Sequence, residues 1–434
     1  MRPAGRIRAA MEIVADIESR RRPAGQALSD WGKNNRFAGS KDRSAIGNIV
    51  YDTLRNRSTT AWRMGEETAR ALVLGTLSFH WKEPSDNLAS LFKDDVHAPD
   101  PLTEAEIQSL DQSTLNDAPD WVKANIPEWL ASELSETFEE ELVSEGIALS
   151  QRPPTDIRVN TIKADRDKVA KSLDRFGPQL TALSPLGLRF SPAEREARNV
   201  NVLPEPGYQK GWFEIQDEGS QLASLLVFAQ PGEQILDYCA GSGGKTLALS
   251  QIMENKGQIF AYDSDRTRLA PIHERLKRAG TRNVQVRSPG NEKLDDLKGS
   301  MHRVIVDAPC SGSGIWRRRP ETKWRLTPES LENRQTEQRN VLLEAAPFVR
   351  PGGYLCYITC SIIPSENEMQ IYNFLEENQG FELVSAGEVW EELVGESDLK
   401  PWSMDGNTLT MTPASTGTDG FFFGVLERTG ESLS

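Results

Sequence analysis

Apolar side chains recur every three or four positions through the first 80 residues, which is the spacing of amphipathic α-helices. Three stripes are clear: Ile7, Ala10, Met11, Val14 and Ile17; Ile46, Ile49, Val50 and Leu54; and Ala69, Leu72, Val73 and Leu77. No strand-like alternation of apolar and polar residues interrupts them. The pattern predicts an all-helical domain at the start of the chain.

Helical periodicity resumes at residues 121–149, where the apolar stripe consists of Trp129, Leu130, Leu134, Phe138 and Leu142. Residues 83–120, between the two helical stretches, are polar, acidic and punctuated by prolines. Such composition is typical of loose connectors with short helices. We therefore expect an acidic connector inside a helical domain that ends near residue 150.

The pattern changes at Arg152-Pro153-Pro154. Residues 156–160 and 212–216 alternate as half-buried strands do, and residues 165–176 between them have helical spacing. A further helix is predicted at residues 221–228. The sequence therefore predicts a small α+β unit over residues 151–228.

From residue 231 onward, short apolar runs alternate with helical patterns in βαβ fashion. The predicted strands are residues 234–237, 257–263, 283–286, 303–307 and 353–359. This order predicts an α/β domain with a parallel, doubly wound sheet that binds its ligand at the carboxyl ends of the strands. Residues 420–426 predict one more strand, which we expect to be antiparallel.

A chain of 434 residues is too long for one hydrophobic core. The pattern accordingly predicts three domains, over residues 1–150, 151–228 and 229–434. No run approaches the roughly 18 apolar residues of a membrane helix, and the basic start continues into helical periodicity, unlike a secretory signal. We therefore expect a cytoplasmic monomer with no membrane partner.

The net charge of −14 argues at first against a polyanionic partner. The acidic residues, however, are concentrated in residues 83–148, whereas the first 70 residues are net basic. Arg43, Arg55, Arg57 and Arg63 lie in that basic part and form either an RNA-facing surface or ordinary solvated helix faces. A nucleic acid partner is therefore compatible with the distribution of charge.

All four cysteines lie in the second half of the chain, which is not the framework of a secreted disulfide protein, so we expect reduced thiols. There is no CxxC pair and the histidines have no ligand spacing, so we expect no metal site. Cys310 and Cys360 directly follow predicted strands, where thiolate chemistry would meet a bound ligand. Cys356 lies inside a strand and is expected in the core.

A glycine-rich turn at residues 237–246 follows the first strand of the βαβ region. A phosphate-binding loop needs glycine in place of Cys239, and a dinucleotide fingerprint needs glycine in place of Thr246, so neither motif is present. Asp263, at the end of the next strand, can hydrogen-bond ribose hydroxyls. These features fit S-adenosylmethionine, which has a ribose and no phosphate.

Three segments together resemble the RNA cytosine-5 methyltransferases of the bacterial Sun/Fmu family. They are Asp-Tyr-Cys-Ala-Gly-Ser-Gly-Gly-Lys-Thr at residues 237–246, Asp307-Ala308-Pro309-Cys310-Ser311-Gly312, and Thr359-Cys360-Ser361. The resemblance covers roughly residues 150–434. It implies a Rossmann-like methyltransferase domain preceded by an RRM-like unit and, in the small-subunit rRNA branch, by an all-helical NusB-like RNA-binding domain. It also implies S-adenosylmethionine as cofactor and 16S rRNA as substrate.

Methylation at carbon 5 of cytosine explains the need for a strand-end thiol. Carbon 5 becomes nucleophilic only after a thiolate has added to carbon 6, and a base must later remove the carbon 5 proton. In the family, the Thr-Cys-Ser cysteine is the nucleophile and the Asp-Ala-Pro-Cys cysteine assists release, which correspond to Cys360 and Cys310. The residues alone leave the order open, since DNA cytosine-5 methyltransferases use a cysteine that follows proline. Asp307 would hold the cytosine ring or the cofactor, and the charge of Lys245 would favour a thiolate.

The resemblance also implies which residues form the cofactor site. They are Cys239, Ala240, Gly241, Ser242, Gly243, Gly244, Lys245, Asp263, Arg268 and Asp307. The basic segment that follows Trp316 suits phosphate contact and base stacking, although a solvated loop is the alternative. Its RNA-binding candidates are Arg317, Arg318, Arg319, Lys323, Trp324 and Arg325. Ser365-Glu366-Asn367-Glu368 matches a capping box, so its acids need no catalytic role.

Two departures from the family pattern keep other functions open. Ser242 stands where the family usually has proline, and Pro289 replaces an acid that usually reaches the cofactor, a loss that Asn291 could compensate. One alternative is a tRNA cytosine-5 methyltransferase. The other is a non-catalytic, RNA-binding ribosome assembly factor that has lost its cofactor.

Overall fold

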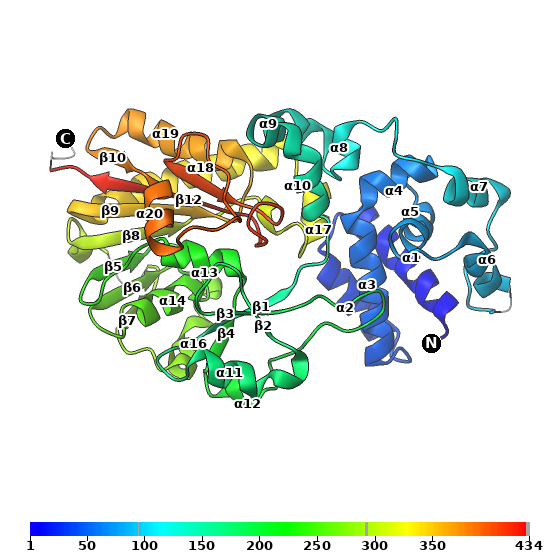
Figure 1. Ribbon diagram of the computed structural model, residues 1–434, viewed down its shortest axis with the longest axis horizontal. Coiled ribbons are helices and arrows are strands. Elements are labelled where there is room, and N and C mark those ends of the chain that lie inside the picture. The colour runs from blue at the N-terminus through cyan, green and yellow to red at the C-terminus, as the bar shows by residue number, and fades with distance from the viewer. Residues whose placement is uncertain (94, 291–293, 431–434) are drawn as a thin grey trace. The chain divides into compact units, whose positions relative to one another are not determined.

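The computed structural model describes residues 1–93, 95–290 and 294–430, and the chain divides into two compact units. The first unit comprises Met1–Pro153, Pro192–Asn199 and Ile315–Leu326; the second comprises Pro154–Ser191, Val200–Gly314 and Thr327–Ser434. The ribbon in Figure 1 follows the chain by colour from the N- to the C-terminus. No helix in the described ranges is long and apolar enough to span a membrane.

The first unit is helical, as the spacing of apolar residues predicts, and its described residues contain no strand. Its helices are α1 (Pro3–Arg20), α2 (Ala24–Asn34), α3 (Ser40–Arg55), α4 (Arg57–Met64), α5 (Ala69–Gly75), α6 (Ser85–Lys93), α7 (Glu104–Gln112), α8 (Asp120–Lys123), α9 (Ala131–Phe138), α10 (Leu142–Ala148) and α17 (Pro320–Arg325). Val14, Ile17, Ile46, Ile49 and Val50 from the predicted stripes are buried together in one core. The stripes therefore face each other, as amphipathic helices require.

The acidic connector contains two ordered helices, α6 and α7. Helix α7 begins at a capping box in which Thr103 accepts a hydrogen bond from the Glu106 backbone and the Glu106 carboxylate accepts one from the Thr103 backbone. Arg70 pairs with the same carboxylate at 2.6 Å. The ion pair between Arg70 and Glu106 thus joins the connector to the helical core. The acidic composition of the connector did not indicate which carboxylate makes this contact.

A small antiparallel sheet in the second unit has the strand order β2-β3-β1-β4. Its elements are β1 (Thr155–Val159), α11 (Arg166–Ser172), β2 (Gln179–Leu180), β3 (Gly187–Phe190), α12 (Pro206–Gln209) and β4 (Phe213–Ile215). The sequence predicted β1, α11 and β4 but missed β2 and β3. Both residues of β2 are exposed, so this strand has no apolar alternation to reveal it.

The larger, eight-stranded sheet has the order β10-β12-β9-β8-β5-β6-β7, with β11 paired to β12. Its strands are β5 (Gln234–Asp237), β6 (Gln258–Tyr262), β7 (Val284–Arg287), β8 (Met301–Asp307), β9 (Val349–Thr359), β10 (Phe381–Val384), β11 (Thr408–Met411) and β12 (Phe421–Arg428). Strands β5 to β9 are parallel, and β12 is antiparallel to β9, as predicted. The sequence missed the short strands β10 and β11.

Helices cover both faces of this sheet (Figure 1). They are α13 (Glu218–Leu225), α14 (Gly244–Ile252), α15 (Arg266–Leu269), α16 (Ile272–Ala279), α18 (Pro328–Ala345), α19 (Glu368–Glu377) and α20 (Ala386–Leu393). Side chains alternate along the strands, so that Ile305 and Cys356 pack with α13, α14 and α20, whereas Val306 and Tyr357 pack with α18 and α19. Cys356 is fully buried, which confirms its place in the core.

The strand order locates the ligand-binding edge of the sheet. From β5 the chain proceeds outward to β6 and β7 and then crosses to β8 on the other side of β5. The carboxyl ends of β5 and β8 therefore flank the point where the winding reverses, which is where doubly wound sheets bind ligands. Those ends are Asp237 and Asp307.

Candidate functional site

A cavity of about 390 Å³ opens at this point of the sheet. It is lined by Ser220, Asp237, Cys239, Ala240, Gly241, Ser242, Gly244, Lys245, Arg268 and Asp307. Most of the predicted cofactor residues thus share one cavity, and the structure adds Ser220 and Asp237, which were not among the predicted cofactor residues. Gly243 and Asp263 are outside the lining and contribute through the turn. Pro289 does not line the cavity either, and Asn291 lies outside the described residues.

The glycine turn adopts a backbone that other residues would strain. Gly243 has φ +83°, and a Cβ added there would lie 2.5 Å from Ile272 Cγ1, so this glycine allows close packing against α16. A Cβ added at Gly244 would meet nothing within 4 Å, because this residue faces the open cavity at the start of α14. The turn therefore leaves room for a ligand beside the helix N-terminus.

Ser242, which stands in place of the family's usual proline, is held from outside the turn. Arg275 of α16 donates hydrogen bonds of 2.9 Å to both the carbonyl and the hydroxyl of Ser242, and it also pairs with Glu214 of β4. The serine is therefore fixed by two contacts that proline could not both accept. Sequence reasoning did not identify Arg275, because it lies 33 residues from its partner.

Asp263 shapes the turn as well as facing the ligand edge. Its Oδ2 accepts a hydrogen bond from the Gly241 backbone at 2.9 Å, and its Oδ1 accepts one from the Asp265 backbone at 2.8 Å. Arg268 of α15 lies 3.9 Å from the same carboxylate. Because each oxygen is already engaged by the backbone, any contact with a ribose would use the second lone pair of an oxygen.

Asp237 is a buried acid in the wall of the cavity. Burial raises its pKa to about 7, although the Thr246 hydroxyl donates a hydrogen bond of 2.6 Å to Oδ2 and opposes the shift. Its Oδ1 is buried without a hydrogen-bond partner among the described residues. A buried acceptor left free in a cavity wall fits a ligand that donates a hydrogen bond.

Lys245 and Asp307 meet between the glycine turn and the end of β8. Lys245 Nζ lies 2.6 Å from Asp307 Oδ2 and 5.3 Å from the ring centroid of Phe421. The lysine is buried, with 6% of its surface exposed. The structure therefore brings together two predicted catalytic residues that are 62 positions apart in the sequence.

Cys310 and Cys360 lie opposite each other with their sulfur atoms 3.4 Å apart. The pKa of the Cys310 thiol is raised well above its ordinary value, chiefly by its hydrogen bond with Cys360 and then by burial. The raised pKa favours the protonated form of Cys310, and an S–H at Cys310 can donate to the Cys360 sulfur. The turns after two neighbouring parallel strands, β8 and β9, create this pair.

The predicted capping box after β9 is wrong. Helix α19 begins at Glu368 with Asn367 as its N-cap, and no side chain caps it. Glu366 instead contacts Ser311 and Ser361, the residues that directly follow the two cysteines. Sequence reasoning missed this role because the partner Ser311 is 55 residues away.

Two of the RNA-binding candidates in the basic segment, Arg317 and Lys323, are buried, which argues against the predicted phosphate contact for them. Lys323 and Trp316 are each 1% exposed and Arg317 is 5% exposed, all of them inside the first unit. Trp324 Nε1 donates to the Leu54 carbonyl at 2.6 Å. Trp324, one of the two flanking tryptophans that suggested base stacking, is therefore bonded to α3. Arg318 is half-buried, and Arg319 and Arg325 are exposed.

The arginines of the first unit are also largely engaged within it. Arg55 is buried and pairs with Asp52, Arg57 pairs with Glu18 and Glu67, and the Arg63 guanidinium lies 3.4 Å from the ring centroid of Phe79. Of the four predicted arginines only Arg43 is exposed, and its Nε donates to the Ala38 carbonyl. These four residues therefore do not form the single RNA-facing surface that their charge suggested.

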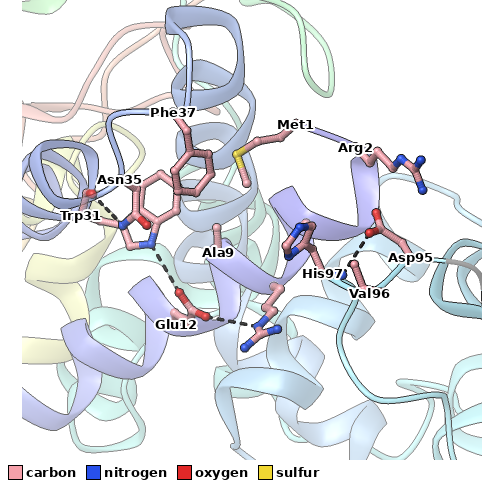
Figure 2. A pocket seen from close by; sticks show the side chains of 12 residues that line it. Met1, Arg2, Ala9, Glu12, Trp31, Asn35, Phe37, Asp95, Val96 and His97 are labelled. Carbon is pink, nitrogen blue, oxygen red and sulfur yellow. Dashed lines mark hydrogen bonds and ion pairs between the residues drawn. The ribbon is translucent and has the colours of Figure 1, made fainter.

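A second cavity, of about 620 Å³, lies within the first unit between the start of α1, α2 and residues 95–97 (Figure 2). Figure 2 shows Trp31 and Phe37 on one side, with the Trp31 indole donating to Glu12 at 3.4 Å. The lining of this second cavity contains no cysteine and no Lys-Asp pair. The chemistry that carbon 5 methylation requires is therefore present at the sheet edge and not in this cavity.

Comparisons with known proteins agree with this architecture. Residues 224–427 match the family described as 16S rRNA methyltransferase RsmB/F, and residues 126–193 match the ferredoxin-like domain of RsmF/B-like methyltransferases. The chain is 31% identical over 312 residues to a probable ribosomal RNA small subunit methyltransferase B of Synechocystis sp., which covers 70% of this chain and 67% of that protein.

Two further proteins extend the comparison. The ribosomal RNA small subunit methyltransferase B of Shigella sonnei is 31% identical over 301 residues, covering 69% of this chain and 66% of that protein. The crystal structure of PH0851 is 25% identical with a TM-score of 0.71, covering 98% of this chain and 99% of that one. The matched region is thus about two thirds of the length of the curated relatives. On this sequence identity and shared fold, the chain belongs to the 16S rRNA methyltransferase RsmB/F family.

Proposed function

We propose that this protein transfers a methyl group from S-adenosylmethionine to carbon 5 of a cytosine in 16S rRNA, with Cys360 as the covalent nucleophile. The observation that carries the proposal is the pair of strand-end thiols 3.4 Å apart, of which Cys310 follows three residues after Asp307 in the cavity lining. Membership of the RsmB/F family supports the choice of substrate. We further expect the protein to act as a cytoplasmic monomer.

The residues of the cavity fit S-adenosylmethionine. Gly244 leaves space at the start of α14, and Asp237 Oδ1 is a buried acceptor with no partner among the described residues. Asp263, Arg268 and the glycine turn would hold the cofactor's polar parts. When bound, the cofactor supplies a methyl group on a positively charged sulfur, which is the electrophile that carbon 5 requires.

The chain's own residues prepare the cytosine. The Cys360 thiolate forms a bond to carbon 6, and the electron pair of the C5–C6 double bond then makes carbon 5 nucleophilic. Cys310 keeps its proton, which prevents it from competing for carbon 6 and allows it to stabilise the neighbouring sulfur through a hydrogen bond. The ion pair of Lys245 and Asp307 orients the carboxylate at the edge where the ring would lie.

Turnover requires loss of the carbon 5 proton and of the enzyme thiol. A base removes that proton, its C–H electron pair restores the C5–C6 double bond, and the bond between carbon 6 and Cys360 breaks, leaving a thiolate. We assign the assistance of this release to Cys310 because its sulfur is the group next to the leaving sulfur. Exposed Arg319 and Arg325, together with half-buried Arg318, are the members of the basic segment that we propose for RNA contact.

The test uses the purified protein, methyl-labelled S-adenosylmethionine, and 16S rRNA and tRNA from cells that lack the gene. We expect label in 16S rRNA, no label with Cys360→Ala, and a covalent RNA adduct on denaturing gels with Cys310→Ala. Full activity of Cys360→Ala would overturn the assignment of the nucleophile. Label in tRNA alone would replace the proposed substrate.

A non-catalytic assembly factor predicts a different result. Calorimetry with S-adenosylmethionine separates the two functions, because an assembly factor that has lost its cofactor would show no binding even at millimolar concentration. Pro289 motivates this alternative, but the cavity does not use that residue. We therefore expect binding.

A further inference from the structure

Glu366 is a fully buried acid that the proposed reaction does not yet use. Its Oε1 accepts hydrogen bonds from the Ser311 backbone at 2.7 Å and from Gln338 Nε2 at 3.0 Å. Its Oε2 accepts from the hydroxyls of Ser311 and Ser361, the latter at 2.6 Å. All four of these donors converge on one carboxylate.

The two serines are the residues directly after the two cysteines. Ser311 follows Cys310 in the turn after β8, and Ser361 follows Cys360 in the turn after β9. Glu366 therefore binds the neighbour of each thiol at once.

Further hydrogen bonds join the two turns around this carboxylate. The hydroxyls of Ser313 and Ser361 lie 2.8 Å apart, and the Gly314 backbone donates to the Cys360 carbonyl at 2.9 Å. Gln338 of α18 also donates to the Pro309 carbonyl at 2.9 Å. The turns thus form one network, and Glu366 is the member that touches both cysteine-bearing segments through its side chain.

We propose that Glu366 is a positioning residue that holds the Cys310 and Cys360 turns together, so that the two thiols lie within contact distance for the methyl transfer reaction. The effect of Glu366 on the rate of methyl transfer rests on the proposed function. Its effect on the separation of the two sulfur atoms does not depend on that function.

The charge of Glu366 supports the same arrangement. It adds to the hydrogen bond of Cys360 and to burial in raising the pKa of the Cys310 thiol, which keeps Cys310 protonated beside Cys360. Burial raises the pKa of Glu366 itself, and its bonds to Ser311, Ser361 and Gln338 oppose that shift. The carboxylate is thus stabilised by the turns that it holds.

Glu368 provides a matched control two residues away. It is also buried, with 6% of its surface exposed, and burial raises its pKa to about 7. Its Oε1 accepts a hydrogen bond of 3.5 Å from the Thr410 hydroxyl on β11, which belongs to neither cysteine turn. Replacing Glu368 therefore removes a buried acid without removing the contact between the turns.

The experiment measures the sulfur separation directly in the full-length protein. Diamide converts two neighbouring thiols into a disulfide and takes up the two protons and two electrons that they lose. Alkylation and peptide mass mapping then give the rate at which the Cys310–Cys360 disulfide forms, without RNA or cofactor. The variants are Glu366→Ala, Glu366→Gln and Glu368→Gln, with thermal unfolding to establish that each is folded.

We expect Glu366→Ala to slow disulfide formation and to lower kcat about a hundredfold, the loss associated with a misplacement of about 1 Å, with an unchanged KM for S-adenosylmethionine. Glu366→Gln keeps the shape but presents an amide N–H₂ to two hydroxyl donors, so we expect an intermediate loss. Glu368→Gln should match the wild type in the disulfide rate.

Wild-type disulfide rates in folded Glu366 variants would overturn the proposal, as would an equal slowing in Glu368→Gln. If Glu366→Ala does not fold, Glu366→Gln decides the matter. A wild-type protein that forms the disulfide rapidly but methylates no RNA would refute the proposed function and leave the geometric role of Glu366 standing.

Discussion

Lys323 is the residue whose burial has the clearest energetic consequence. Its ammonium group lies inside the first unit, 3.3 Å from Ser150 Oγ and 5.0 Å from the ring centroid of Trp324, and it is 1% exposed. Burial, together with the charge of Arg55, lowers its pKa to about 7. Lys323→Met removes the charge and keeps an apolar chain of similar length.

The sign and size of the effect follow from the two pKa values. The unfolded chain holds the proton up to the ordinary pKa of 10.5, whereas the folded chain releases it near pH 7, so between these values the unfolded state binds more protons. Stability therefore rises with pH across this window, by about 1.4 kcal/mol per unit and about 5 kcal/mol in total. Below pH 7 the wild type bears the full cost of the buried charge.

Urea unfolding from pH 6 to pH 10, monitored by tryptophan fluorescence, tests the reasoning. We expect Lys323→Met to be more stable than the wild type at pH 6, and the difference to shrink as pH rises toward 10. Lys41→Met, at an exposed position of the same unit, is the control and should show a constant difference.

A pH-independent difference between Lys323→Met and the wild type would refute the burial argument. RNA affinity gives a second criterion. A lysine that contacts phosphate would, when replaced, weaken RNA binding and lower the salt slope by about one. We expect Lys323→Met to change neither quantity.

Two further predictions concern the cofactor cavity. Gly243→Ala should destabilise the protein by about 1–3 kcal/mol in urea unfolding, because its Cβ would lie 2.5 Å from Ile272 and its φ is positive. Gly244→Ala should leave stability within about 0.5 kcal/mol. It should nevertheless weaken S-adenosylmethionine binding in calorimetry, because its methyl group enters the cavity. Equal stability losses for both would contradict the assignment. The pKa of Asp237 is raised from 3.8 to about 7, so between these values the folded state binds more protons than the unfolded state. The stability of the wild type should therefore fall by about 4 kcal/mol as pH rises from 4 to 7, and Asp237→Asn should lack this decline. The same decline in the variant would count against the cost assigned to the buried carboxylate.

The site was predictable in part because of a regularity of parallel sheets. Residues that follow strands in a βαβ pattern meet at one edge, so Asp263, Asp307, Cys310 and Cys360 could be placed together from their positions after apolar runs. Periodicity also identified the helical unit and five parallel strands. The strands β2, β3, β10 and β11 escaped; in β2, for example, both residues are exposed, so there is no alternation to be recognised.

The errors arose where long-range packing decides a residue's role. Lys323 and Arg317 belong to a segment rich in charge and indole rings, a composition that suits an RNA surface and a buried anchor equally well. Only the contacts with Leu54 and Ser150, more than 150 residues away, distinguish the two. Glu366 was likewise assigned to a helix cap because its local sequence fits one.

The sequence by itself determined the order of the strands along the chain, the chemistry available at their ends and the resemblance to the cytosine-5 methyltransferases, since each depends on residues that are near one another in the chain. Tertiary structure alone decided that Cys310 and Cys360 lie 3.4 Å apart, that Glu366 joins their turns and that Lys323 is buried. The physical reason is that hydrogen bonds and burial depend on distances in space, which periodicity and local motifs do not encode.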